Sequence, residues 1–242
     1  MDRAARLDLI RDLRERTRQI EASRRAANPD ALSTGFDALD QLLPGPGLPW
    51  GTLTEWLNEC EGGGALTLAL AIAAKAVRRG GAFVMIDGAN EFYPPAAAQL
   101  GIPLDRMLVV RPDNPRTALW AWEQALRCEG VAATLGWIAE LSDRPFRRLQ
   151  LAAETGGGLG FLLRPPACRA TPSWAAARLS VTPRPGRGPL YAPSRRLRIA
   201  LLHGGSEQGG AFVEVELCHE ADDVHLVSEL ADPKAPRRAA LA

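Results

Sequence analysis

Lysine is almost absent from this sequence. Its 242 residues contain only Lys75 and Lys234, so nearly all of the positive charge is arginine, which we interpret mainly as genome composition. The 29 basic and 28 acidic residues give a formal net charge of +1. A balance this close to neutral argues against a generally basic nucleic-acid binder, although it leaves local charged patches open.

Long apolar runs and paired cysteines are also missing. No apolar run reaches the roughly 18 to 20 residues that span a bilayer. The first 25 residues mix arginine with aspartate and glutamate and do not form a signal peptide. The sequence therefore predicts a cytoplasmic protein with no membrane contact. We expect neither disulfides nor a metal site, because the cysteines lack CxxC spacing; they are Cys60, Cys128, Cys168 and Cys218.

The two ends of the chain differ from its middle. Residues 1–28 are predicted to form a basic amphipathic helix with one apolar face. That face packs on the protein's own core or binds a partner, and it comprises Leu7, Ile10, Leu13 and Ile20. Residues 218–242 are predicted to be an acidic and then disordered tail.

The middle, residues 29–217, alternates between predicted strands and helices. Strands are expected at 51–57, 82–87, 108–111, 132–139 and 159–164, and helices at 65–79, 95–101, 115–129 and 146–155. This order predicts an α/β fold with a mostly parallel sheet and helices on both faces. Two period-2 segments, 195–203 and 211–216, then predict a C-terminal antiparallel hairpin.

A glycine-rich turn, Gly62-Gly63-Gly64, joins the first of these strands to the following helix. Strand, glycine turn and helix together form the layout of a phosphate-binding loop, in which backbone N–H groups hold the phosphates. A glycine-rich turn of this kind is also found where a helix only packs closely against a strand. The triple glycine alone does not distinguish a phosphate-binding loop from such a packing turn.

The side chains around the turn do not suit a nucleotide. A working loop has a lysine directly after the last glycine and then serine or threonine for Mg²⁺, but Ala65 and Leu66 stand there. Glu59 and Glu61 add negative charge where phosphate would lie. Lys75 is about ten residues along the helix, roughly 15 Å away at 1.5 Å per residue.

The segments around this turn resemble the core of the RecA recombinase over roughly residues 32–140. Order and spacing match in Leu32-Ser33-Thr34-Gly35, Leu39-Asp40, Gly47-Leu48-Pro49-Trp50-Gly51, Glu55, Thr67-Leu68-Ala69-Leu70, Phe83-Val84-Met85-Ile86-Asp87, Ala98-Gln99-Leu100-Gly101-Ile102-Pro103-Leu104-Asp105 and Leu108-Val109-Val110. The resemblance implies a RecA-like core.

A later segment resembles one subgroup, the ImuA family, also called SulA-like. It runs Arg147-Arg148-Leu149-Gln150-Leu151-Ala152-Ala153-Glu154, then Gly156-Gly157-Gly158-Leu159-Gly160 and Phe161-Leu162-Leu163-Arg164-Pro165. The resemblance implies an accessory protein of SOS-induced translesion synthesis that acts through protein contacts. The implied partners are an ImuB-like Y-family polymerase subunit, RecA and an error-prone replicative-type polymerase.

Other RecA catalytic positions are also changed. The water-activating glutamate of the recombinase lies two residues after a strand-end aspartate; counted from Asp87, that position is Ala89, with Glu91 two residues beyond. The strand at 132–139 ends next to Glu140 without the expected aspartate. We therefore expect no ATP hydrolysis, no cofactor and no small-molecule substrate. The alternatives are a residual RecA- or RadA-type ATPase and a SulA-type inhibitor of cell division.

An arginine-rich stretch, predicted as a loop over 164–198, contains no acidic residue. In RecA the corresponding region carries the DNA-binding loops. Arginine pairs with phosphates and stacks on bases, so the stretch contacts single-stranded DNA, binds an acidic partner or is simply solvated. Its arginines are Arg164, Arg169, Arg178, Arg184, Arg187, Arg195, Arg196 and Arg198. Separately, Trp120 and Trp122 lie two residues apart on a helix, so at most one is fully buried, and the other marks an interface or is incidentally exposed.

Overall fold

The computed structural model describes residues 31–185, 195–203, 211–217 and 229–230. The predicted N-terminal helix with Leu7, Ile10, Leu13 and Ile20 lies outside these residues, as do Arg187 and most of the predicted tail. In the described part of the chain, no helix is long and apolar enough to cross a membrane.

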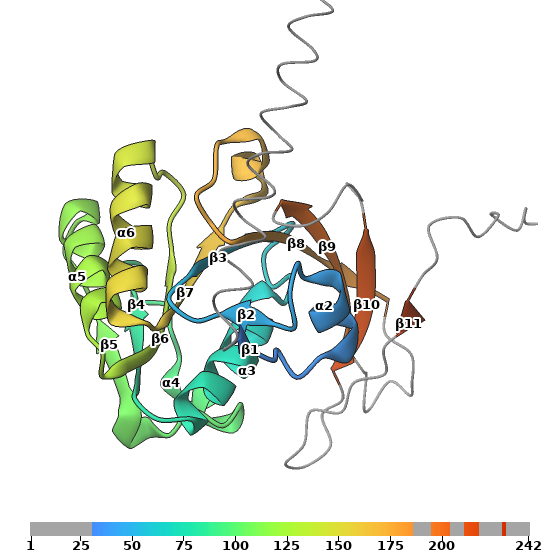
Figure 1. The fold of residues 1–242 in the computed structure, drawn as a ribbon, viewed down its shortest axis with the longest axis horizontal. Coiled ribbons are helices and arrows are strands. Elements are labelled where there is room, and N and C mark those ends of the chain that lie inside the picture. Colours follow the sequence, from blue (N-terminus) through green and yellow to red (C-terminus); the bar gives the residue numbers. More distant parts are fainter. Residues whose placement is uncertain (1–30, 186–194, 204–210, 218–228, 231–242) are drawn as a thin grey trace, which may run out of the picture.

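A nine-stranded sheet forms the centre of the molecule (Figure 1), in the order β11-β10-β9-β8-β3-β7-β6-β4-β5. The six strands from β8 to β5 are parallel, and β9, β10 and β11 continue the sheet in antiparallel pairs. Its strands are β3 (Leu53–Asn58), β4 (Ala82–Ile86), β5 (Met107–Val110), β6 (Val131–Trp137), β7 (Leu159–Arg164), β8 (Ala177–Arg184), β9 (Arg195–His203), β10 (Phe212–Leu217) and β11 (Glu229–Leu230). A separate two-stranded ribbon pairs β1 (Ala31–Leu32) with β2 (Leu48–Pro49).

Helices cover the sheet on both faces. The described helices are α2 (Asp37–Leu42), α3 (Ala65–Arg78), α4 (Pro94–Gln99), α5 (Pro115–Arg127) and α6 (Asp143–Gly156), with 3-10 turns η1 (Leu104–Arg106) and η2 (Pro166–Ala170). One apolar cluster joins α2, α3 and α4 to the first face, and a second joins α5 and α6 to the other. The alternating pattern thus produces a three-layer α/β domain, as predicted.

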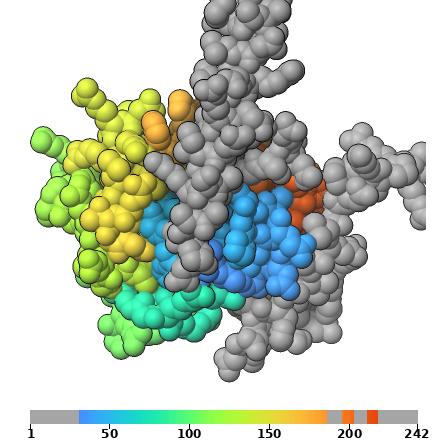
Figure 2. Space-filling model, viewed as in Figure 1, coloured from blue at the N-terminus to red at the C-terminus, as the bar shows by residue number. Residues whose placement is uncertain are grey.

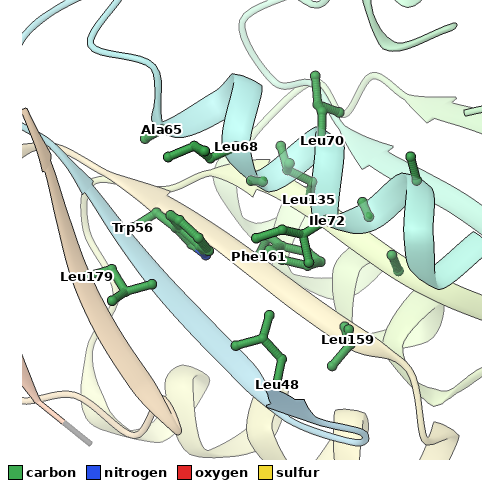
Figure 3. Packing of buried hydrophobic residues seen from close by; sticks show 14 of the residues in the cluster. Leu48, Trp56, Ala65, Leu68, Leu70, Ile72, Leu135, Leu159, Phe161 and Leu179 are labelled. Atoms are coloured by element: carbon green, nitrogen blue, oxygen red, sulfur yellow. The ribbon is translucent and has the colours of Figure 1, made fainter. Parts of the chain in front are cut away.

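The first cluster is centred on α3, an alanine- and leucine-rich helix that buries most of its length. Figure 3 shows Ile72 of this helix close to Phe161 and Leu135 of the sheet, with Trp56 to their left. The Trp56 and Phe161 rings lie 6.3 Å apart between centroids. Burying a side chain such as Phe161 stabilises the folded protein by roughly 1.5–3 kcal/mol. Because α3 is held on the sheet by such contacts, the glycine turn at its N-terminus is held in place as well.

The structure differs from the sequence prediction in two places. Strand β8 lies inside the stretch predicted as an arginine-rich loop, and β11 adds a strand within the predicted tail. Helix α2, which begins at Asp37, has Phe36 as its N-cap and no side-chain cap.

Ser33 and Thr34 bind Asp40 instead. Their hydroxyl groups each donate to its carboxylate at 2.6 Å, and the Thr34 N–H donates at 2.9 Å. The shared carboxylate closes the turn between β1 and α2, so the motif is a turn and not a helix cap.

Candidate functional site

The glycine turn lies at the carboxyl end of β3, directly before α3. Gly64 is the N-cap of the helix with φ 97°, a left-handed conformation that glycine adopts without strain. Ala65 and Leu66 follow as the first two helical residues. The geometry is therefore the strand–turn–helix arrangement predicted from the sequence, with short or apolar side chains where lysine and serine or threonine hold phosphate and metal.

The protein's own residues pack closely around this turn. Arg195 of β9 donates a hydrogen bond from Nη2 to the Gly62 carbonyl. A Cβ atom on Gly64 would lie 2.6 Å from Leu197 Cδ2, and one on Gly63 would lie 2.3 Å from Asn58 Oδ1. Both glycines are thus required by close neighbours, which supports the packing interpretation of the turn.

One of the two carboxylates near the turn, that of Glu59, is bound by other side chains of the protein. Glu59 accepts a hydrogen bond from Ser180 Oγ at 2.5 Å and pairs with Arg169. The hydrogen bond from Ser180 lowers the Glu59 pKa most, burial opposes it, and the hydrogen bond and charge of Arg169 lower it further, so that the Glu59 pKa lies below its ordinary value. Glu61 is exposed on the turn. The Lys75 side chain packs against the backbone of Gly35 and is not among the atoms next to the glycines of the turn.

The strand-end aspartate is also committed to local structure. Asp87 is buried, and its carboxylate accepts hydrogen bonds from the N–H groups of Glu91 and Phe92 at 3.0 and 3.3 Å. Arg111 lies 3.5 Å away. Ala89 and Glu91 are exposed on the turn that Asp87 closes, so this carboxylate shapes the turn.

A buried ion cluster, which the sequence analysis missed, lies beneath η2. Glu55 is fully buried in β3, with its carboxylate 2.6 Å from Arg164 Nη1 and 2.6 Å from Arg178 Nε. Ser173 Oγ donates to the same carboxylate at 2.6 Å. Burial raises the Glu55 pKa, but the hydrogen bonds from Arg178, Ser173 and Arg164 outweigh it and leave that pKa below its ordinary value.

The cluster also holds the segment that connects β7 to β8. Arg178 Nη1 donates to the carbonyls of Arg169 and Thr171 at 3.0 and 2.8 Å. Arg164 Nη2 donates to Ala139 O at 3.0 Å, and the Cys168 thiol donates to the same carbonyl at 3.1 Å. A glutamate inside the apolar strand Leu53–Asn58 was the sequence signal for this cluster, because such a charge needs buried partners.

The structure separates the described contact arginines into three groups by their exposure. Arg164 and Arg178 are 3% and 5% exposed, so the expectation that they contact DNA or a partner is corrected: their guanidinium groups are used internally by Glu55. Arg169, Arg184 and Arg195 are exposed. Arg196 and Arg198 are half-buried: Arg196 pairs with Glu214 at 2.7 Å, and Arg198 lies 3.6 Å from the Phe212 ring centroid.

The two tryptophans of α5 behave as the helical spacing requires. Trp122 is 1% exposed and its indole N–H donates to Thr134 Oγ1 at 2.8 Å, whereas Trp120 is 61% exposed. Among the described residues, no group of three or more histidine, cysteine, aspartate or glutamate side chains is arranged to hold a metal ion.

The fold and the glycine turn define a RecA-like protein. The RecA N-terminal domain model matches residues 18–136. RecA of Deinococcus radiodurans is 30% identical over 177 residues, covering 73% of this chain and 46% of that protein. RecA of Thermus thermophilus is 40% identical over 131 residues, covering 54% of this chain and 36% of that protein.

A second comparison narrows the class. Protein ImuA of Caulobacter vibrioides strain NA1000 is 32% identical over 232 residues, covering 88% of this chain and 95% of that protein. The chain belongs to the ImuA family. It is accordingly a RecA-like protein of the DNA-damage response.

Proposed function

We propose that this protein is a non-catalytic adaptor in SOS-induced translesion DNA synthesis. It binds a Y-family-like polymerase subunit of the ImuB type, and RecA and an error-prone replicative-type polymerase are further partners. It needs no cofactor and turns over no small-molecule substrate.

The closed glycine turn is the observation that carries this proposal. Arg195 and Leu197, both from β9, pack on Gly62 and Gly64, and Ala65 takes the position of the phosphate-binding lysine. The turn is therefore used to join α3 to the antiparallel part of the sheet. A RecA-like scaffold that uses this turn for packing acts through its surfaces.

The exposed arginines supply part of that surface. Arg169 of η2, Arg184 of β8 and Arg195 of β9 carry exposed charge that suits contact with single-stranded DNA or with an acidic partner. Such contacts mainly set the rate of association and the choice of partner.

Damage-induced mutagenesis in cells tests the proposal. A strain without this protein should lose the mutagenesis, and the wild-type chain should restore it. A tagged chain recovered from damage-treated cells should carry a polymerase-like subunit. Gly62→Asp adds a carboxylate to the turn at a position where a side chain meets open space, and this variant should retain mutagenesis. A well-folded Gly62→Asp protein that is inactive would show that the nucleotide site still matters.

A further inference from the structure

Two exposed tryptophans flank a row of arginines on the α5–α6 side of the molecule. Trp120 of α5 is 61% exposed, and Trp174, between η2 and β8, is 46% exposed. Arg144, Arg147 and Arg148 lie exposed on α6 between them. We call these five residues the tryptophan–arginine face; the green and yellow surfaces of α5 and α6 form this side of the molecule in Figure 2.

Contacts inside the protein hold this face in place. The Arg147 guanidinium lies 5.2 Å from the Trp174 ring centroid. Arg148 pairs with Glu123 of α5, which also binds Arg127 at 2.8 Å, so the two helices are tied together. The neighbour of Trp174, Ser173, is bound to the buried Glu55 at 2.6 Å. The face is therefore preorganised, which lowers the entropy cost of binding.

The arginines stand where the helix itself disfavours them. Arg144, Arg147 and Arg148 lie in the first two turns of α6, close to the positive end of the helix dipole. Asp143 is the acidic residue of its first turn. Positive charge near a helix N-terminus is unfavourable, most of all in the first turn, and a negatively charged ligand on this face offsets it.

We propose that the tryptophan–arginine face binds an acidic segment of a partner protein. Carboxylates of the segment pair with Arg144 and Arg147, and apolar side chains of the segment pack on Trp120 and Trp174. Tryptophan and arginine are the residues most enriched at the energetic centre of protein interfaces. The proposal deepens the adaptor function and rests on it, because it assigns one partner-binding surface.

The dimensions of the face suit a short segment. Two adjacent helices present a width on the order of 20 Å. An extended segment of about six residues has that length at roughly 3.3 Å per residue. Protein is favoured over nucleic acid as the occupant because Arg148 is already paired with Glu123. Arg144 and Arg147, set between two tryptophans, suit a few carboxylates among apolar side chains better than a continuous line of phosphates, which needs a denser row of cations.

Selection from a random 12-residue peptide library on the immobilised full chain tests the proposal. The enriched peptides should contain several aspartates or glutamates around an apolar residue, and their affinity should fall as salt rises. Trp120→Ser and the double variant Arg144→Glu/Arg147→Glu should each weaken binding of an enriched peptide at least tenfold. The altered side chains are exposed, so both variants should fold. The arginine double variant should be at least about as stable as the wild type, because glutamate suits the start of a helix better than arginine.

Matched controls separate this face from general effects of charge and aromatic loss. Arg106→Glu in η1 removes an exposed arginine elsewhere, and Trp137→Ala removes a tryptophan, 41% exposed, at the end of β6. Both controls should bind the peptide as the wild type does. Enrichment of peptides without carboxylates, no enrichment at all, or equal loss in the controls overturns the proposal.

Competition with a 20-nucleotide oligothymidylate tests whether the face binds single-stranded DNA instead of a peptide. If the oligothymidylate displaces the peptide, and its own binding is lost in the Trp120 and Arg144/Arg147 variants, the face is a nucleic-acid surface and the proposal is wrong. If no acidic peptide binds this face, the proposed binding site is wrong, but the adaptor function can still depend on other surfaces. If the peptide binds and the protein is not needed for mutagenesis, the adaptor function is wrong and the peptide-binding site is still supported.

Discussion

Arg178 of β8 and Glu55 of β3 lie directly opposite each other in the register of two neighbouring strands and are joined by a 2.6 Å ion pair in the interior. Arg164 of β7, on the other side of β3, completes the cluster at 2.6 Å. One carboxylate thus ties three parallel strands together at the point where the fold turns from its parallel to its antiparallel half.

Removing this carboxylate should destabilise the protein strongly. Glu55→Gln leaves two buried guanidinium groups without a counter-charge, which costs about 3–5 kcal/mol. For a chain of this size that lowers the melting temperature by roughly 6–20 °C. Differential scanning calorimetry measures the shift. Glu59→Gln is the control: its carboxylate is partly exposed to solvent and should give a much smaller change.

The buried cluster around Glu55 should also make the stability of the protein depend on pH in the acid range. The pKa of Glu55 is lowered on folding, so its contribution to stability is present above its unfolded pKa of about 4.3 and is lost as pH falls through the lower folded value. The free energy of unfolding, measured by urea denaturation from pH 6 downward, should drop below about pH 4. Glu55→Gln should lack that part of the drop; identical acid profiles for both proteins would contradict the assignment.

Charge reversal should distinguish the arginines of the 164–198 stretch that stabilise the fold from those that are available to bind a ligand. Arg178→Glu places a second carboxylate beside the buried Glu55 and should prevent stable folding. Arg184→Glu changes a side chain that is 38% exposed and lies 3.9 Å from Glu214, so the core should stay folded. If the exposed arginines contact single-stranded DNA, Arg184→Glu and Arg195→Glu should weaken that binding and reduce its dependence on salt. Full DNA affinity in both variants would assign these arginines to another partner.

The glycine turn should tolerate substitution unequally. Gly62 and Gly64 both have positive φ, but a Cβ atom on Gly62 meets open space and one on Gly64 meets Leu197. Gly64→Ala should therefore be less stable than Gly62→Ala by about 1–3 kcal/mol, the usual cost of overpacking. In a double-mutant cycle, Leu197→Ala should recover part of the loss from Gly64→Ala, and additive effects would argue against contact between the two positions.

Periodicity and motif order were enough to predict five of the six parallel strands of this fold, all except β8. The strand at Leu159–Arg164 and the helix starting at Ala65 were placed correctly, since both are bounded by glycine and have long apolar patterns. Strand β8 was missed because prolines and arginines dominate its neighbourhood and resemble a loop. Sequence spacing also does not reveal that Arg178 lies opposite Glu55, 123 residues away in the chain, so two buried arginines were assigned to the surface.

Restoring the phosphate-binding residues should not restore ATP hydrolysis. Ala65→Lys/Leu66→Thr supplies the lysine and the magnesium ligand, but Arg195 and Leu197 still pack on the turn and Ala89 still provides no general base. Asp87 remains bound to the N–H groups of Glu91 and Phe92. We expect isothermal titration with Mg·ATP to give no binding in the low micromolar range for either protein, and phosphate release to stay at the background rate. A triple variant that also carries Leu197→Ala relieves the packing on Gly64, so it should gain ATP binding before it gains any hydrolysis. Hydrolysis by the double variant would show that the turn opens readily and that closure by β9 is not what keeps nucleotide out.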